Sequence, residues 1–111
     1  LLYRLVFNLV ENAIRYSRPG SNVDVSICDN DSHVFLRVED QGPGIPKQYR
    51  ESIFQPFFRL DKSRSRAYGG AGLGLALVWE IAALHGGTVE VETSSENGTV
   101  MLVALSKGAT T

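Results

Sequence analysis

The chain has 111 residues, of which 43% are apolar and one is a cysteine, and its 11 basic and 12 acidic side chains give a formal net charge of −1. A chain of this length can bury roughly 65% of its unfolded surface, which is enough for one core without disulfides. The single cysteine excludes an internal disulfide and a cysteine-based zinc site, and the balanced charge gives no basic field that would indicate a nucleic-acid or membrane-surface partner. No apolar run approaches the length of a membrane span.

The first third of the chain predicts a helix followed by a hairpin. Residues 1–16 contain neither glycine nor proline and repeat apolar residues at helical spacing, until Pro19-Gly20 ends the pattern. Residues 23–27 and 34–38 then alternate apolar and polar residues, which predicts two antiparallel strands. We expect Cys28, on the first of these strands, to be a small buried residue. Because Leu1 is not a methionine and opens within a helical pattern, we expect a piece of a longer protein.

The rest of the chain predicts a short helix, a long loop, a second long helix and another hairpin. Pro46 suits a first helical position, so residues 47–54 are expected to be a short helix. Residues 55–71 show no clean period and carry four cations against one anion, as in a functional loop or lid. Residues 72–84 have helical spacing before Gly86-Gly87, and residues 88–93 and 99–105 alternate around a turn. The polar tail, residues 106–111, is expected to be frayed.

This order of elements predicts an α+β fold, in which the hairpins pair antiparallel and the helices cover one face of the sheet. The strand–helix alternation of a doubly wound nucleotide-binding fold is not present. We expect one domain over residues 1–111.

The first helix carries a polar ridge beside its apolar face. At about 100° per residue, Asn8, Asn12 and Arg15 lie within a narrow arc, while Glu11 lies at its edge. Asparagine is a poor helix former, because its amide competes for backbone hydrogen bonds. The ridge is either a solvated face with an Asn–Asn pair or a ligand site, since amide oxygens can coordinate magnesium and arginine can bind phosphate.

Two glycine-containing segments allow close approach of a ligand to the backbone. Asp40 ends a strand just before Gly42 and Gly44, which fits either an ordinary turn or a carboxylate beside a flat ligand. Residues 70–75 alternate glycine with other residues before a helix, which fits either a hinge or an anion site of backbone N–H groups. Their spacing is neither that of the dinucleotide fingerprint nor that of a P-loop.

Four segments together resemble the catalytic and ATP-binding domain of bacterial sensor histidine kinases. This domain belongs to a superfamily that also includes type II topoisomerases, heat-shock chaperone ATPases and mismatch-repair ATPases. Residues 8–17 resemble its N box, residues 40–45 its G1 box, residues 53–59 its F box and residues 70–75 its G2 box. The boxes occur in the family's order and cover nearly the whole chain. The resemblance implies a Bergerat-type ATP-binding fold: a two-layer α/β sandwich with a mixed, mainly antiparallel sheet covered on one face by about three helices, and ATP between the helices and the lid.

The resemblance also implies roles for single residues. Asn12 would ligate Mg²⁺ with help from Asn8, Arg15 would contact phosphate, and Tyr16 would meet the sugar or base. Asp40 would accept a hydrogen bond from the adenine amino group. Arg59 is expected to meet phosphates from the lid and is counted as catalytic with Asn8 and Asn12. The other expected nucleotide-binding residues are Gly42, Gly44, Ile45, Lys62, Gly70, Gly72, Leu73, Gly74, Leu75 and Thr99.

One position bears on the mechanism. In the hydrolysing relatives a glutamate that activates water stands four residues before the metal-binding asparagine, and here that position is Asn8. An amide cannot take a proton, so hydrolysis by general-base catalysis loses its base. Glu11 is on the same helix, but its angle points it away from Asn12. ATP would then be held for transfer to another acceptor.

The resemblance implies a protein-histidine kinase of a two-component system that donates the γ-phosphate of Mg-ATP to a histidine. Neither histidine of this chain fits the acceptor, because His33 lies in a turn and His85 closes a helix. The acceptor is therefore expected on a separate helical dimerisation domain of the same kinase, with a response regulator downstream. We expect the fragment to be a monomeric cytoplasmic domain. We expect the longer parent protein to be a homodimer and, because most relatives carry membrane-spanning sensors, to be anchored in the inner membrane. A serine kinase of the anti-sigma type, an ATP-binding regulatory module without transfer and a chaperone-like ATPase are the alternatives.

Overall fold

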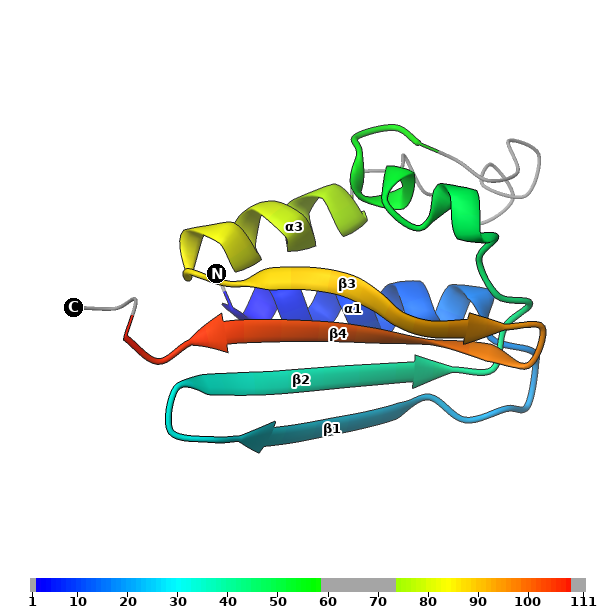
Figure 1. Ribbon diagram of the computed structural model, residues 1–111. Helices are drawn as coiled ribbons and strands as arrows, with labels where there is room; N and C mark the ends of the chain where they lie inside the picture. Colours follow the sequence, from blue (N-terminus) through cyan, green and yellow to red (C-terminus); the bar gives the residue numbers. More distant parts are fainter. Residues whose placement is uncertain (1, 59–73, 109–111) are drawn as a thin grey trace.

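The computed structural model describes residues 2–58 and 74–108. In chain order their elements are α1 (Leu2–Tyr16), β1 (Asp24–Asp29), β2 (His33–Asp40), the 3-10 turns η1 (Lys47–Tyr49) and η2 (Ser52–Phe54), α3 (Gly74–Leu84), β3 (Thr88–Ser95) and β4 (Gly98–Ser106). Both hairpins and both long helices predicted from the sequence are present (Figure 1).

The four strands form one sheet in the order β1-β2-β4-β3, and every pairing among them is antiparallel. The resemblance implied a mixed, mainly antiparallel sheet, whereas the described strands are antiparallel throughout. Figure 1 shows α1 and α3 on the same face of this sheet. The α+β prediction is therefore confirmed, with β2 and β4 at the centre of the sheet.

The core lies between this face and the two helices. Residues on α1 at i and i+4 spacing, Leu5, Leu9 and Ala13, turn inward together because they share one side of the helix. The strands contribute every second residue, as the pleat requires. The remaining buried apolar residues are Leu36, Val38, Ile53, Phe54, Val78, Ile81, Ala82, Val89, Met101 and Val103.

Strand β1 forms the outer edge of the sheet and is exposed along its whole length. Val25 and Ile27 pair with core residues of β2, yet their side chains remain 47% and 70% exposed. The alternating pattern thus identified a strand but not its burial, because it does not say whether a helix covers the edge. For the same reason the prediction that Cys28 is buried was wrong: its thiol is free and exposed.

The short helix predicted over residues 47–54 was also wrong, because the structure has two separate 3-10 turns there. Pro46 precedes the first turn, and its carbonyl accepts a hydrogen bond from the Tyr49 N–H at 2.9 Å. Two short turns, rather than one continuous helix, bring Ile53 and Phe54 into the core at 7% and 6% exposure. The ring of Phe54 then lies against Trp79 of α3, with 5.4 Å between centroids.

The predicted lid and tail lie only partly within the described residues. Phe58, at the start of the lid segment, packs against the core and contacts the Tyr49 ring at 5.7 Å between centroids, whereas residues 59–71 lie outside the description. In the tail, Lys107 donates from its backbone N–H to the Ser32 carbonyl at 2.8 Å and from Nζ to Asp29 Oδ2 at 2.6 Å. Fraying from residue 106 was therefore wrong at Lys107, which is tied to the β1–β2 hairpin. In the described part of the chain, no helix is long and apolar enough to cross a bilayer.

Candidate functional site

Three chain segments that are distant in sequence meet at one end of the sheet: the end of α1, the end of β2 and the β3–β4 turn (Figure 1). Hydrogen bonds from backbone and side chains join them directly. The Arg18 N–H donates to the Gln41 carbonyl at 3.3 Å, and the Gln41 N–H donates to Ser17 Oγ at 3.1 Å. The Arg18 guanidinium reaches the Glu96 carbonyl at 2.6 Å. This end of the fold is therefore held together by bonds between distant segments of the chain itself.

Asp40 is the buried acidic residue at this end, with 7% of its surface exposed. Its Oδ1 accepts two backbone hydrogen bonds, from the Gly42 N–H at 3.0 Å and from the Thr99 N–H at 3.2 Å. Burial raises the pKa of the Asp40 carboxyl, and these two N–H donors oppose that rise without cancelling it. Among the described residues no hydrogen bond reaches Oδ2, so this oxygen can still accept one from a ligand.

The segment after Asp40 packs so closely against other backbone that Gly42 and Gly44 have no space for a side chain. A Cβ on Gly42 would overlap the Tyr16 carbonyl oxygen, so the segment after β2 lies directly against the end of α1. Gly44 has φ of 87° and sits equally close to the backbone of Ser95. The close approach that the sequence suggested at these two glycines is therefore present, and it is made first of all with the protein's own backbone.

A second group of bonds at this end was not identified from the sequence. Ser94 Oγ accepts from the Ile45 N–H at 2.8 Å and shares a hydrogen bond of 2.7 Å with Thr99 Oγ1. The Arg50 guanidinium donates to the Ile45 carbonyl at 3.3 Å and to the Ser94 carbonyl at 3.2 Å. No local signal marks either residue, since the sequence places Ser94 in a turn and Arg50 in the predicted short helix.

The polar ridge of α1 is present, but the Asn–Asn pair that one interpretation expected between Asn8 and Asn12 is not formed. Asn8 donates from Nδ2 to the Arg4 carbonyl at 2.8 Å, which leaves its Oδ1 turned toward α3, where a Cβ on Gly74 would lie 3.6 Å away. Asn12 is half-buried, and within the described residues its amide makes no hydrogen bond. Arg15 forms an ion pair with Glu11 at 3.6 Å.

The structure therefore groups the predicted residues into two sets. Asp40, Gly42, Gly44, Ile45 and Thr99 share the corner beside Tyr16, and Asn8 lies next to the start of α3 at Gly74. Leu75 packs partly against the hydrophobic core. The predicted residues that lie outside the described part of the chain are Arg59, Lys62, Gly70, Gly72 and Leu73.

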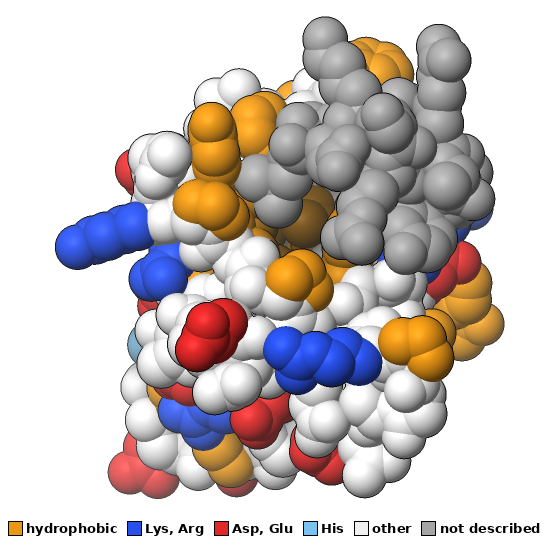
Figure 2. All heavy atoms as spheres, turned by 90° about the vertical axis from the view of Figure 1, so that its right-hand side faces the viewer, with side chains coloured by type: hydrophobic (Ala, Val, Ile, Leu, Met, Phe, Trp, Pro, Cys, Tyr) orange, Lys and Arg blue, Asp and Glu red, His pale blue; other side chains and the backbone are white. Residues whose placement is uncertain are grey.

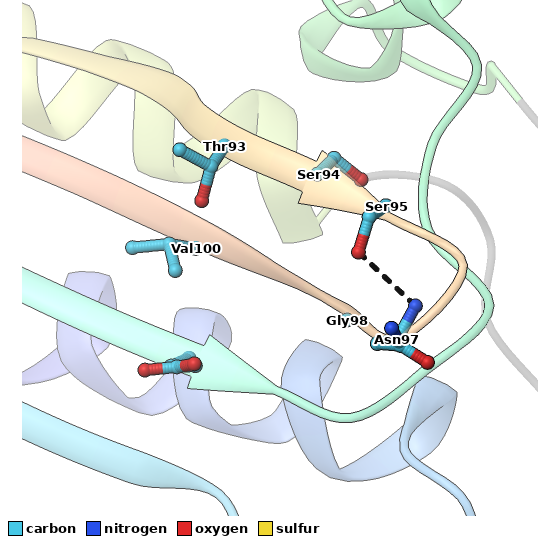
Figure 3. Close-up of a pocket in the computed structure, with 7 residues that line it drawn as sticks. Thr93, Ser94, Ser95, Asn97, Gly98 and Val100 are labelled. Atoms are coloured by element: carbon cyan, nitrogen blue, oxygen red, sulfur yellow. Dashed lines mark hydrogen bonds between the residues drawn. The ribbon is translucent and has the colours of Figure 1, made fainter.

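A separate cavity of about 180 Å³ lies at the same end of the sheet (Figure 3). Its lining includes Glu39, Thr93, Asn97 and Val100 but not Asp40. Successive residues of a strand point to opposite faces, so the Glu39 side chain belongs to the face opposite the one that carries Asp40. Ser94 and Gly98 also line this cavity, so it borders the Asp40 corner although Asp40 itself does not line it.

Figure 2 views the molecule from this end. Among the described side chains visible there, acidic and basic groups are interspersed, and apolar side chains lie between them. The described side chains in this view therefore form no surface of a single charge.

Comparison with known proteins shows what this geometry resembles. A family model described as "Histidine kinase-, DNA gyrase B-, and HSP90-like ATPase" matches residues 1–109. Sensor protein RstB of Escherichia coli (strain K12) is 49% identical over 98 residues, covering 88% of this chain and 22% of RstB. The chain therefore spans about a fifth of the length of that relative.

Solved structures agree with the sequence comparison. The mycobacterial sensor histidine kinase MprB superimposes with a TM-score of 0.79 at 37% identity, over 93% of this chain and 68% of that one. Full-length ShkA in complex with AMPPNP gives a TM-score of 0.79 at 28% identity, over 94% of this chain and 21% of that one. The fold expected from the resemblance is thus the fold found in sensor histidine kinases.

Proposed function

The chain belongs to the family of histidine kinase-, DNA gyrase B- and HSP90-like ATPases, and we propose that it is the single ATP-binding domain, residues 1–111, of a longer protein-histidine kinase. In this proposal it binds Mg-ATP and donates the γ-phosphate to a histidine on a separate domain. The observation that carries the proposal is the state of Asp40, a buried carboxylate with one oxygen held by two backbone donors.

The Asp40 corner fits the edge of an adenine ring. A flat aminopurine needs an acceptor for its amino group and a backbone wall without side chains beside it. Asp40 Oδ2 provides the acceptor, and Gly42 and Gly44 provide the wall. Ile45 and Thr99 complete the corner, and Tyr16 at the end of α1 would lie on the sugar or base side. A keto group in place of the amino group would meet a carboxylate oxygen instead of a donor, which disfavours guanine.

The residues of α1 fit the phosphate end of the same nucleotide. The Asn12 amide makes no hydrogen bond within the described residues, so its oxygen is available to a hard cation, and Asn8 stands one turn earlier on the same helix. When bound, Mg²⁺ would neutralise phosphate charge. Within the described residues Arg15 is held by a partly exposed ion pair to Glu11, which costs little to exchange for a phosphate. The proposal adds Arg59, Lys62, the glycines at 70, 72 and 74, Leu73 and Leu75 to the nucleotide-binding residues.

The chemistry proposed is phosphoryl transfer rather than hydrolysis. The bond between the γ-phosphorus and the β–γ bridging oxygen breaks, a bond to an imidazole nitrogen of the acceptor forms, and ADP leaves. Such transfer depends mainly on positioning and charge stabilisation. The amide of Asn8 stands where a general base would be needed for water and cannot accept a proton, so bound ATP is protected from hydrolysis.

The proposed partners follow from what this chain lacks. His33 begins β2 and its Nδ1 contacts Ser32 Oγ at 2.8 Å, while His85 follows α3 with its Nε2 buried. Both are far along the chain from the α1 ridge and are tied into the fold. We propose that the acceptor histidine belongs to a helical dimerisation domain of the same kinase, that a response regulator acts downstream, and that the domain is cytoplasmic within a homodimeric parent.

A nucleotide titration tests the binding half of the proposal. Calorimetry of the chain with ATP should show saturable binding that strengthens with Mg²⁺ and exceeds that of GTP. Equal affinity for ATP and GTP would count against an adenine site at Asp40. Absence of any nucleotide binding would remove the proposed function altogether.

A labelling experiment tests the transfer half. The chain is incubated with γ-labelled ATP, Mg²⁺ and the histidine-bearing dimerisation domain of a related sensor kinase such as RstB. Acid-labile, alkali-stable label on that domain supports the histidine kinase. Acid-stable label on a protein serine indicates the anti-sigma type of kinase, and bound ATP without any label indicates a regulatory module. Rapid release of inorganic phosphate by the chain alone indicates an ATPase.

A further inference from the structure

The Ile45 peptide is held at both of its polar groups by residues outside the sequence motifs. Its N–H donates to Ser94 Oγ at 2.8 Å, and its carbonyl accepts from Arg50 Nε at 3.3 Å. From this geometry we infer that Ser94 and Arg50 are positioning residues that set adenine selectivity by fixing the segment after Asp40. The inference rests on the proposed function, because it takes adenine as the ligand of that corner.

The Arg50 guanidinium bridges two separate parts of the chain. While Nε donates to the Ile45 carbonyl, a terminal nitrogen donates to the Ser94 carbonyl on β3 at 3.2 Å. The side chain is half-buried, so water competes only in part for these bonds. A planar guanidinium can make both bonds from fixed directions, whereas a lysine ammonium is a single point donor on a flexible stem.

The Ser94 hydroxyl connects that segment to the residue that holds the aspartate. Ser94 Oγ and Thr99 Oγ1 are 2.7 Å apart, and the backbone N–H of Thr99 donates to Asp40 Oδ1 at 3.2 Å. Ser94 therefore links Ile45, at the far end of the segment, with Thr99, which faces Asp40 at its near end. Ser94 holds the Ile45 end of the segment directly, and through Thr99 it is connected to the donor that holds Asp40.

This anchoring determines where the free oxygen of Asp40 points. Oδ1 is held by the N–H groups of Gly42 and Thr99, so the carboxylate plane follows the position of these two backbone groups. If Ile45 and Thr99 lose their common partner, the segment carrying Gly42 can shift and Oδ2 loses its fixed direction. A misdirected acceptor weakens the hydrogen bond that distinguishes an amino group from a keto group, while contacts to sugar and phosphates are retained.

The test compares three variants of the 111-residue chain with two matched controls. Ser94→Ala removes the hydroxyl, Ser94→Thr keeps it, and Arg50→Lys keeps the charge without the planar fork. Ser32→Ala and Arg37→Lys make the same chemical changes elsewhere: Ser32 lies in the β1–β2 turn, and Arg37 pairs with Glu92 on the exposed side of the sheet. Dissociation constants for ATP and GTP are measured in parallel with amide hydrogen exchange at Ile45.

We expect Ser94→Ala and Arg50→Lys to lower the ATP-to-GTP affinity ratio by about tenfold, the effect of one misdirected hydrogen bond. Exchange of the Ile45 N–H should accelerate in both variants, and Ser94→Thr should behave as the unmodified chain. The inference is overturned if the unmodified chain selects ATP while Ser94→Ala and Arg50→Lys keep its ATP-to-GTP affinity ratio. It is also overturned if either control variant lowers this ratio equally, or if Ser94→Thr lowers it as much as Ser94→Ala. If the unmodified chain does not bind ATP, the proposed function is overturned instead, before any variant is compared.

Discussion

Asp40 and Thr99 face each other across β2 and β4, and the Thr99 N–H donates to the Asp40 side chain at 3.2 Å. Both residues are buried, with 7% and 3% of their surfaces exposed. Next to Thr99, Gly98 has φ of 150° and lies so close to the Asp40 carbonyl that a Cβ would overlap it. The carboxylate is thus oriented by backbone on two sides, and its geometry is set by the fold rather than by a ligand.

Asp40→Asn should keep the fold but lose adenine selection. The Oδ1 of asparagine can accept the same two N–H bonds, from Gly42 and Thr99, so the backbone contacts survive. The second position becomes an NH₂ group, which donates and therefore opposes an adenine amino group. Losing a hydrogen bond to a charged acceptor costs about 1.5–3 kcal/mol, or roughly 10- to 150-fold in ATP affinity. Calorimetric titration with ATP and GTP checks this, and an unchanged ATP affinity would contradict it.

The raised pKa of Asp40 predicts how the stability of the ligand-free chain depends on pH. Because burial lifts this pKa above its ordinary value of 3.8, the folded chain retains the Asp40 proton at pH values where the unfolded chain has lost it. The free energy of unfolding should therefore fall as pH rises from about 4 through the raised pKa, and then level off.

Asp40→Asn isolates this contribution from other carboxylates. The Glu92 pKa, for example, is lowered by its bond to Arg37, so Glu92 contributes stability that is lost on acidification and masks the effect in the parent. Subtracting urea-unfolding free energies of parent and variant across pH 3 to 8 removes such shared terms. The difference should favour the parent increasingly toward low pH, and a difference independent of pH would show that Asp40 titrates normally.

The sequence predicted the elements of this fold well where local pattern decides them. Alternation found all four strands, and the 3.6-residue period found α1 and α3, since each pattern reflects which side of an element is buried. Local pattern did not predict burial correctly where burial depends on segments that are distant in the sequence. The edge position of β1, the exposure of Cys28 and the division of residues 47–54 into two turns follow from what packs against them, which no local window contains.

The same distinction applies to the candidate site. Asp40 and its two glycines were identified because carboxylate and glycine at a strand end form a recognisable short pattern. Ser94 and Arg50 were missed because both act through backbone atoms that lie far away in sequence: Ser94 is 49 residues from Ile45. A bond from a side chain to a distant carbonyl or N–H leaves no spacing that a sequence pattern can detect.

Asn12→Ala should remove the part of ATP affinity that depends on Mg²⁺. The amide of Asn12 makes no hydrogen bond within the described residues, so its truncation should leave the fold intact. Parent and variant are titrated with ATP in Mg²⁺ and in EDTA, and only the parent should show a difference. Asn97→Ala is a matched control, because it makes the same side-chain change in the β3–β4 turn, outside α1. Unchanged Mg²⁺ dependence in Asn12→Ala would refute its assignment as a metal ligand.

Gly42→Ala should damage both stability and binding, because the added Cβ would overlap the Tyr16 carbonyl and crowd Asp40 Oδ1 at 3.3 Å. Gly42 does not have a positive φ, so the cost comes from overlap alone, about 1–3 kcal/mol as for other overpacked sites. Gly108→Ala is the matched control, since among the described residues a Cβ there would meet just Ser106 Oγ, at 4.0 Å. The free energy of unfolding in urea and the ATP affinity should both fall in Gly42→Ala. Neither should change in the control. Full ATP affinity in Gly42→Ala would mean that the segment after β2 can leave α1 without disturbing the nucleotide, and that the contact with Tyr16 does not shape the site.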